Sequence, residues 1–389
     1  MTKIHSYDVF DTVLTRKVGT PKSSFFILGR KLKRLNLIQC SAEAFSSIRE
    51  DSERRAFKKA GGLDSNVSLS TIYQEVGYAL CLLDEEIQEI RAMEEQLEID
   101  LLSPVPKILR SITDARKQGL KIFFISDMYI GSKFIEERLK SFEILAKKDR
   151  IYVSCDYNKS KKSEKLFNEV LVQERINKSD IIHIGNHSHS DVNVPRKLGF
   201  QVIPFLEGNL NRYEKIMENF VEHSEGLSSA MAGASRLARL SSKQLSVRED
   251  SLREVAAGVA SPIVVGFTLW VLRRAESLGL NRLYFLSRDG QILVRIANCL
   301  AQKLNINIKV IYLYGSRQAW LLPSLTSIQI EKLNAIFNLE NEVDYLSPRI
   351  IFSRFSISPS EIKSSLKKIK LLPKDYDENL DYQERKRLL

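Results

Sequence analysis

Apolar runs of strand length recur in the first half of the chain, and each ends in a short polar segment. The runs are residues 4–9, 120–125, 151–155, 181–184 and 201–205. Continuous apolar runs of this length are typical of strands buried on both faces of a parallel sheet. Amphipathic helical patterns lie between them, at residues 104–119, 132–142, 163–174 and 193–198. This alternation predicts an α/β fold with a doubly wound parallel sheet.

A long helical insertion follows the first predicted strand. Helical patterns cover residues 24–35, 42–60, 70–82 and 84–99. We find no strand-like alternation between residues 21 and 102. An insertion between the first strand and the next strand–helix unit predicts a lid over the mouth of a site. A simple helical subdomain is the alternative, which the sequence leaves open.

Three of the strand ends carry polar side chains suited to chemistry. Asp8 follows the first strand, Ser126 the second, and the segment Gly185 to Asp191 a later one. Ligands of open α/β sheets bind beyond the carboxyl ends of the strands, so we expect these residues to meet at one edge. An aspartate there can act as a nucleophile or hold Mg²⁺, and a short hydroxyl can hold a phosphoryl oxygen. The alternative is that each residue merely caps a turn or helix.

A lysine cluster lies between the last two of these strand ends, at Lys159, Lys161 and Lys162. Positive charge at the start of a helix is unfavourable with respect to the helix dipole, so the cluster indicates an anion nearby. A solvated run of charge is the alternative. His187 and His189 follow a strand without a third ligand, and we expect them to be exposed to solvent rather than to bind a metal.

Composition limits the class of protein. The 389 residues are 43% hydrophobic and 28% charged, which is ordinary for a globular chain of two or three domains. The net charge of +11 favours anionic partners. The four cysteines are scattered and form no CxxC pair, which excludes a zinc ribbon. Because they also give no disulfide framework and the N-terminus has no signal-peptide pattern, we expect a cytoplasmic location. Val255 to Leu272 is the most apolar window, which we expect to be a buried helix and not a membrane span.

The second half predicts further units. Residues 207–250 are charged and helix-forming and predict a helical linker. Residues 251–323 predict a second α/β domain, in which Arg288 and Arg317 stand at polar strand ends. These arginines could clamp a phosphate or carboxylate, or simply pair with Asp289 to close the turns. Residues 324–389 predict a basic helical tail, whose weak helix-turn-helix pattern makes nucleic-acid binding a minor alternative.

The ordered set of strand ends resembles the motifs of the haloacid dehalogenase (HAD) superfamily of hydrolases, over residues 3–206. DVFDTVL resembles the first motif, FFISD the second, KKSEKLF the third and HIGNHSHSD the fourth. The resemblance implies a HAD-like Rossmannoid core from residues 1–16 and 103–206, with a C1-type helical cap at residues 17–102. DVFDT and YFLSRDG are similar to a subgroup of predicted hydrolases often associated with surface-polysaccharide gene clusters.

The resemblance also implies roles for individual residues. Asp8 would be the nucleophile, Ser126 would bind the transferred phosphoryl group, and Lys161 or Lys162 would neutralise its charge. Thr12 and Asp127 are candidate substrate contacts beside them. The reaction would be hydrolysis of a small phosphorylated metabolite, such as a sugar phosphate or nucleotide, through an aspartyl-phosphate intermediate.

The metal site implied by the resemblance is a Mg²⁺ site. Its ligands would be the carboxylate of Asp8, the backbone carbonyl of Phe10, and side chains of the fourth motif at Asn186 and Asp191. Asn186 stands where the family usually has an aspartate. An amide offers an oxygen but no negative charge, so weaker Mg²⁺ binding is expected.

A second departure concerns the general acid/base. Family phosphatases place an aspartate two residues after the nucleophile, where this chain has Phe10. The next acid is Asp11, a candidate for the missing role because it is only one residue further, although strand alternation would put it on the face opposite Phe10. Loss of a proton donor typically costs about 10²- to 10⁴-fold in rate. The dehalogenases proper also lack this acid, and they use no metal. The alternative to a phosphohydrolase is a catalytically impaired relative that binds an anionic ligand or a partner protein.

Overall fold

The computed structural model describes residues 4–62, 64–241, 246–316, 319–320, 323, 345–368, 370 and 376–387. The chain divides into two compact units, one up to Ile263 and the other from Val264.

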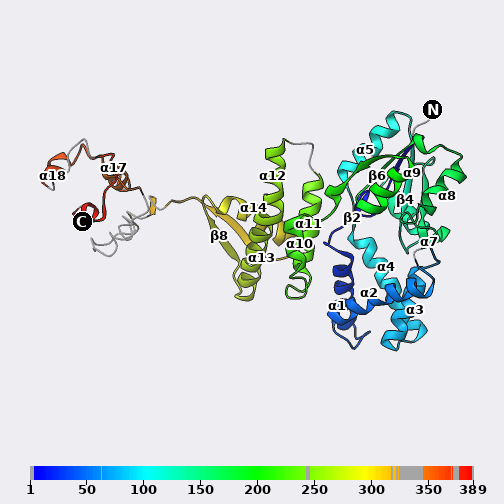
Figure 1. Ribbon diagram of the computed structural model, residues 1–389. Coiled ribbons are helices and arrows are strands. Elements are labelled where there is room, and N and C mark those ends of the chain that lie inside the picture. The colour runs from blue at the N-terminus through cyan, green and yellow to red at the C-terminus, as the bar shows by residue number, and fades with distance from the viewer. Residues whose placement is uncertain are drawn as a thin grey trace. The chain divides into compact units, whose positions relative to one another are not determined.

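The first unit is built on a parallel sheet (Figure 1). Its strands are β1 (Ile4–Tyr7), β4 (Lys121–Ser126), β5 (Arg150–Val153), β6 (Ile181–Gly185) and β7 (Gln201–Pro204), in the order β5-β4-β1-β6-β7. All four neighbouring pairs are parallel. In the centre, Tyr7 pairs with Phe124 of β4 and with Ile184 of β6, so the three strands end side by side. The α/β prediction and the order of its strands along the chain are confirmed.

Helices cover both faces of this sheet. They are α5 (Pro106–Lys117), α6 (Ser132–Ser141), α7 (Ser154–Tyr157), α8 (Lys165–Glu174) and α9 (Val194–Leu198), with short turns η1 (Lys178–Asp180) and η2 (Ser188–Asn193). Successive residues of β4 enter different cores. Phe124 packs with α5 and α6, whereas Phe123 packs with α8 and α9. This is the two-residue period of a strand buried on both faces, which explains its unbroken apolar sequence.

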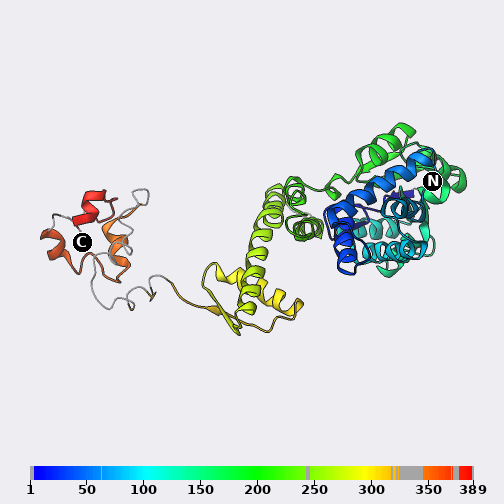
Figure 2. The same ribbon diagram turned by 90° about the horizontal axis from the view of Figure 1, so that it is seen from below.

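The inserted cap consists of α1 (Pro21–Arg34), α2 (Ala42–Lys59), α3 (Leu69–Leu80) and α4 (Asp84–Leu101). These helices lie below the sheet in Figure 1 and in front of it in Figure 2. Two short strands that we did not predict, β2 (Leu14–Arg16) and β3 (Leu102–Pro104), pair antiparallel where the chain enters and leaves the cap. Pro104 therefore belongs to a strand and not to the start of a helix. Three residues are too few to give a periodic pattern.

The segment after β7 also belongs to the first unit. It contains η3 (Leu206–Gly208), α10 (Arg212–Glu218) and α11 (Leu227–Ser241), followed by α12 (Val247–Val255) and η4 (Ala256–Ala260). We expected residues 207–250 to connect two domains. Instead α11 packs directly on the entrance to the cap, where a Cβ atom added to Gly233 would lie 2.2 Å from the carbonyl carbon of Lys17.

The second unit contains α13 (Ser261–Ser277), which begins before the boundary, then β8 (Arg282–Leu286), α14 (Gly290–Lys303) and β9 (Lys309–Leu313). β8 and β9 pair parallel, and Phe285, Leu272 and Ala297 form their core. The short helices α17 (Pro348–Ser353), α18 (Lys363–Lys368) and α19 (Tyr382–Arg387) come later in the chain. Residues 324–344 of the predicted tail lie outside the described residues.

One helical stretch among the described residues, Val247–Ser277, is long and apolar enough to cross a membrane by length and composition. Only 17% of its apolar window is buried in the structure. The burial that we predicted for residues 255–272 is therefore wrong. Length and composition alone are weak evidence for a membrane span, since helices of soluble proteins meet the same criterion.

Candidate active site

A cavity of about 570 Å³ lies beyond the carboxyl ends of the central strands. Its core side is formed by the strand ends that we singled out in the sequence, including Asp8, Ser126, Asn186 and Asp191. The cap closes the opposite side with Phe25, Glu50, Glu53, Arg54 and Phe57. The cap therefore lines the site, as a lid would. The volume suits a small molecule.

A buried lysine joins two carboxylates at the base of this cavity. Lys161 Nζ lies 2.5 Å from Asp8 Oδ1 and 2.6 Å from Asp191 Oδ1. The three residues are 2%, 6% and 1% exposed in the order Lys161, Asp8, Asp191. The backbone N–H of Asp8 donates to the carbonyl of Ile184 at 2.8 Å, which fixes the nucleophile candidate between β1 and β6. By contrast Lys162 is exposed, so Lys161 is the lysine that the structure brings to the site.

The two carboxylates differ in how stable their charge is. Burial and the neighbouring Asp191 together raise the pKa of Asp8 to about 7, despite the attraction of Lys161. Burial also acts on Asp191, but Lys161 and His183 outweigh it and hold the pKa of Asp191 below its usual value. Lys161 stays charged, because the attraction of Asp191 and Asp8 outweighs burial and raises its pKa. Asp8 is thus the carboxylate that a further nearby cation would stabilise most.

Asp191 is oriented by groups that the sequence did not reveal. Its Oδ2 accepts a hydrogen bond from the backbone N–H of His187 at 3.0 Å, and His183 Nε2 lies 3.4 Å from Oδ1. The other ring nitrogen of His183 is 2.8 Å from Ser6 Oγ. Burial lowers the pKa of His183. His183 occupies an inward position of β6 two residues before Gly185, and this placement is the signal that could have found it.

The remaining core residues surround the same centre. Thr12 Oγ1 lies 3.1 Å from Asp8 Oδ2 and 3.2 Å from Asn186 Oδ1, so its one proton can be donated to either oxygen. The carboxylate of Asp127 accepts a hydrogen bond from the backbone N–H of Lys161 at 2.8 Å. Burial raises the pKa of Asp127. Ser126, at the end of β4, is 1% exposed and lines the cavity. His187 Nδ1 accepts the backbone N–H groups of His189 at 3.3 Å and of Ser190 at 3.2 Å in the turn that follows.

The loop that carries Lys161 is also held from the cap. Asp64, in the loop after α2, accepts hydrogen bonds from Ser160 N at 2.9 Å and from Ser163 Oγ at 2.6 Å. Lys165 Nζ lies 2.8 Å from its other oxygen. Sequence reasoning missed Asp64, because a single aspartate in a polar loop carries no distinguishing pattern.

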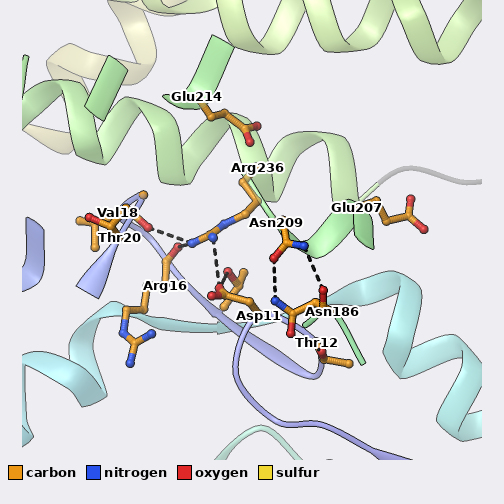
Figure 3. A network of polar contacts seen from close by, with 12 residues as sticks. Asp11, Thr12, Arg16, Val18, Thr20, Asn186, Glu207, Asn209, Glu214 and Arg236 are labelled. Atoms are coloured by element: carbon orange, nitrogen blue, oxygen red, sulfur yellow. Dashed lines mark hydrogen bonds and ion pairs between the residues drawn. The ribbon is translucent and has the colours of Figure 1, made fainter. Parts of the chain in front are cut away.

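Asp11 lines the cavity, although strand alternation had placed it on the opposite face from Phe10. The prediction was wrong because β1 ends at Tyr7, and Asp11 lies in a turn with the left-handed φ of 55°. Its Oδ1 accepts from Thr15 Oγ1 at 2.8 Å and pairs with Arg236 Nη1 at 3.1 Å (Figure 3). Phe10 also lines the cavity, and the guanidinium of Arg16 lies 5.0 Å from the centre of its ring.

Asn186 is fixed by a second asparagine. Its Nδ2 donates to Asn209 Oδ1 at 2.8 Å, and Asn209 Nδ2 donates back to the Asn186 carbonyl at 3.0 Å (Figure 3). With its amide nitrogen engaged by Asn209, Asn186 directs its oxygen toward Thr12. Neither Asn209 nor Arg236 lies within a motif that we recognised in the sequence.

The oxygen donors at this centre suit a hard cation. Within the described residues no cluster of three or more His, Cys, Asp or Glu side chains could hold a metal. The candidate set is instead mixed: the carboxylates of Asp8 and Asp191, the carbonyl of Phe10 and the amide oxygen of Asn186. Such oxygens fit Mg²⁺, which usually takes one or two carboxylates and keeps several waters. Because the pKa of Asp8 is raised, a cation bound beside it would stabilise its carboxylate form.

Of the two arginines predicted at strand ends of the second unit, the structure describes Arg288. Arg288 follows β8 with a left-handed φ of 75°, and its backbone N–H donates to the hydroxyl of Tyr312 at 3.1 Å. Arg317 lies outside the described residues. The ligand site predicted at these strand ends stays a prediction.

The fold and the site together define a Rossmann-like α/β domain with an aspartate–lysine–aspartate centre beneath a helical cap. Residues 18–205 match the family described as haloacid dehalogenase-like hydrolase. The chain therefore carries a haloacid dehalogenase-like hydrolase domain. The match begins after Asp8 and ends before Leu206, so α10 and α11 lie beyond it. No curated protein matches the chain.

Several solved structures are similar to the chain. A HAD phosphatase from Thermococcus onnurineus is 15% identical, with 54% of this chain and 87% of that chain covered and a TM-score of 0.37. The L-2-haloacid dehalogenase from Xanthobacter autotrophicus, with chloropropionic acid covalently bound, is 13% identical over 60% and 88%, with a TM-score of 0.40. The putative HAD-hydrolase YfnB from Bacillus subtilis, bound to magnesium, is 16% identical over 53% and 89%, with a TM-score of 0.39.

Proposed function

We propose that the protein is a Mg²⁺-dependent phosphohydrolase that acts on a small phosphorylated metabolite, such as a sugar phosphate or nucleotide. The observation that supports this most is the position of Lys161, buried between Asp8 and Asp191 at the base of the cavity that the core and the cap line together. A lysine in that place can neutralise an anion delivered to Asp8. Phosphoryl transfer needs mainly positioning and charge neutralisation, which this arrangement supplies.

The reaction starts with Asp8. A carboxylate oxygen of Asp8 attacks phosphorus, and the bond from phosphorus to the leaving oxygen breaks. Lys161 offsets the charge on the phosphoryl oxygens, and Ser126 donates a hydrogen bond to one of them. Water then attacks phosphorus, the bond to Asp8 breaks, and inorganic phosphate leaves. Mg²⁺ held by Asp8, Asp191, the Phe10 carbonyl and Asn186 would supply charge stabilisation for the phosphoryl oxygens.

Asp11 is the proposed proton carrier in place of the acid missing at Phe10. Asp11 lines the cavity, and the Thr15 hydroxyl donates to its carboxylate. In the first step it would protonate the leaving oxygen, and in the second it would take a proton from the attacking water. This is the ordinary alternation of a general acid/base.

A panel of sugar phosphates and nucleotides, assayed for phosphate release with Mg²⁺, tests this function. Wild-type protein is expected to hydrolyse at least one class of compound, and Asp8→Asn to abolish that turnover. EDTA is expected to suppress the turnover, and added Mg²⁺ to restore it. Turnover that persists in Asp8→Asn would contradict the assignment of the nucleophile.

One observation favours a second candidate, a catalytically impaired module that binds an anionic ligand or partner. At the usual acid position Phe10 is covered by Arg16, which is itself 5% exposed and paired with Glu98 at 2.6 Å. A module of this kind would bind compounds of the panel without hydrolysing them. Calorimetric binding of a phosphorylated compound without phosphate release would favour it over the enzyme. Anion binding at Arg288, and nucleic-acid binding by the basic tail, stay predictions.

A further inference from the structure

Asp11, the first acid after the departure at Phe10, and Asn186, the other departure from the family pattern, are each held by the segment that follows the matched domain. Arg236 of α11 pairs with Asp11, and Asn209 pairs with Asn186 (Figure 3). Both partners lie beyond Phe205, outside the residues that match the family. The same segment therefore contacts the catalytic loop after β1 and the loop after β6.

Arg236 makes three contacts from a buried position. It is 2% exposed, and its Nη1 pairs with Asp11 Oδ1 at 3.1 Å. Its Nη2 donates to the carbonyls of Arg16 at 3.2 Å and of Val18 at 2.9 Å. The planar guanidinium thus joins the Asp11 carboxylate to the strand through which the chain enters the cap. Lysine could not make these contacts in the same way, because its three N–H donors share one nitrogen and are not spread over a planar fork.

Buried ion pairs and close backbone packing hold α10, α11 and the loop before them in place. Arg239 pairs with the buried Glu214 at 2.9 Å and donates to the carbonyls of Glu207 and Asn209, which ties α10, α11 and the loop before them together. The backbone of Lys17 lies directly on Gly233, where no Cβ atom would fit. Breaking a buried ion pair from one side leaves an uncompensated buried charge, so these contacts hold their geometry.

Further contacts tie the segment to the beginning of the cap. Ser229 Oγ accepts the backbone N–H of Gly19 at 3.0 Å. Glu218 accepts hydrogen bonds from Thr20 at 2.8 Å and from Ser23 at 2.6 Å, at the first turn of α1. The cap entrance from Arg16 to Ser23 is therefore lined on one side by α10 and α11.

We propose that residues 206–241 are a working part of the active site, in which Arg236 is a positioning residue that holds the Asp11 carboxylate at the cavity. Asn209 does the same for the amide of Asn186. Asp11 stands one position later than the usual acid and in a left-handed turn, and Arg236 together with Thr15 fixes its direction. The role assigned to Asp11 rests on the proposed function, whereas the positioning of its loop does not.

The test uses full-length Arg236→Met, with Asp11→Asn as the comparison and Arg212→Met as the matched control. Arg212 is an exposed arginine of the same segment that contacts Tyr213. Hydrogen exchange of residues 10–20 is expected to rise about tenfold or more in Arg236→Met, and to stay at the wild-type rate in Arg212→Met. Unchanged exchange in Arg236→Met would overturn the proposal, whatever the outcome of the phosphatase panel.

Kinetics with p-nitrophenyl phosphate or the best panel substrate tests the link to chemistry. Arg236→Met and Asp11→Asn are each expected to lower kcat by about 10²-fold or more, with KM changed much less, and to accumulate phosphorylated Asp8. The double variant is expected to be no slower than the slower single variant, because both changes remove one function. Multiplicative losses would overturn the assignment. If Arg236→Met does not fold, Arg236→Lys keeps the charge and gives the same comparison with smaller effects.

Discussion

The ammonium group of Lys161 lies 2.5 Å from a carboxylate oxygen of Asp8, and both residues are almost completely buried. The two are far apart in the sequence and meet because β1 occupies the centre of the sheet. A second carboxylate, Asp191, lies 2.6 Å from the same nitrogen. One positive charge thus holds two negative charges at the base of the cavity, and stability and chemistry at this point depend on the same lysine.

Lys161→Met is expected to leave two buried carboxylates without their cation. Removing one partner of a buried ion pair costs about 3–5 kcal/mol, and the lost charge neutralisation should lower kcat by about 10²- to 10³-fold. Urea unfolding and phosphate release measure the two effects. The matched control is Lys162→Met, an exposed neighbour expected to change the free energy of unfolding by less than about 0.5 kcal/mol. Equal effects of the two substitutions would contradict the assignment of Lys161.

Asp64 predicts a pH dependence of stability. Burial raises its pKa, but hydrogen bonds from Lys165, Ser163 and Ser160 outweigh burial and hold the pKa well below its usual range. The folded-state pKa is lower than the unfolded value of about 3.9, so the stabilisation is complete above that value and is lost as pH falls through the folded pKa.

The measurement is the difference in free energy of unfolding between wild type and Asp64→Asn, by urea at several pH values. The difference is expected to be constant from neutral pH to about pH 5 and to shrink below about pH 4. Asp51→Asn, on the exposed surface of α2, is the control and is expected to show a much smaller difference. A difference that grows as the pH falls would have the wrong sign for this contact.

The cap has its own buried ion pair, between Arg49 and Glu94. Arg49 is fully buried, and its Nε and Nη2 each donate to Glu94 at 2.8 Å. Tyr73 donates to the same carboxylate at 2.6 Å. Glu94→Gln is expected to destabilise the protein by about 3–5 kcal/mol, because the buried guanidinium loses its buried counter-charge and keeps only the more exposed Glu53, 2.9 Å from Nη1. Glu95→Gln, on the more exposed side of the same helix, is expected to cost less than about 0.5 kcal/mol, and thermal unfolding distinguishes the two.

Gly233 tests how closely α11 approaches the cap entrance. An added Cβ atom would lie 2.2 Å from the carbonyl carbon of Lys17 and 2.4 Å from the nitrogen of Val18, both of which are backbone atoms. Gly233→Ala is expected to destabilise by about 1–3 kcal/mol, although alanine favours a helix over glycine. Ala234→Ser, at an exposed neighbouring position, is the control for a one-atom enlargement. Increased stability in Gly233→Ala would show that α11 does not pack on the cap entrance.

The sequence was sufficient for the parallel sheet and for the meeting of Asp8, Ser126, Lys161 and Asp191. Buried parallel strands have continuous apolar sequences, and their ends lie at one edge by topology. The strands β2 and β3 were not predicted, because three residues are too few to show an alternation of apolar and polar positions. Asp11 was misplaced because strand alternation was extended past Tyr7, where the strand ends.

Other parts of the site depend on contacts that leave no local trace. Arg236, Asn209 and Asp64 contact the catalytic loops from distant segments, and each is one polar residue among many in its own helix or loop. The helix predicted at residues 255–272 lies within the observed helical stretch Val247–Ser277 but is largely exposed, since an apolar composition does not specify what covers it.

Direct trapping of the covalent intermediate is the sharpest measurement of the role of Asp8. The protein is incubated with Mg²⁺ and the best panel substrate and is then treated with borohydride, which converts a phosphorylated aspartate to homoserine. The treated protein is digested, and mass spectrometry locates the homoserine. The reduced residue is expected at Asp8 in wild type, in larger amount in Asp11→Asn, and to be missing in Asp8→Asn. Folded protein that binds the same compounds but yields no modified Asp8 and no phosphate would contradict the phosphohydrolase assignment.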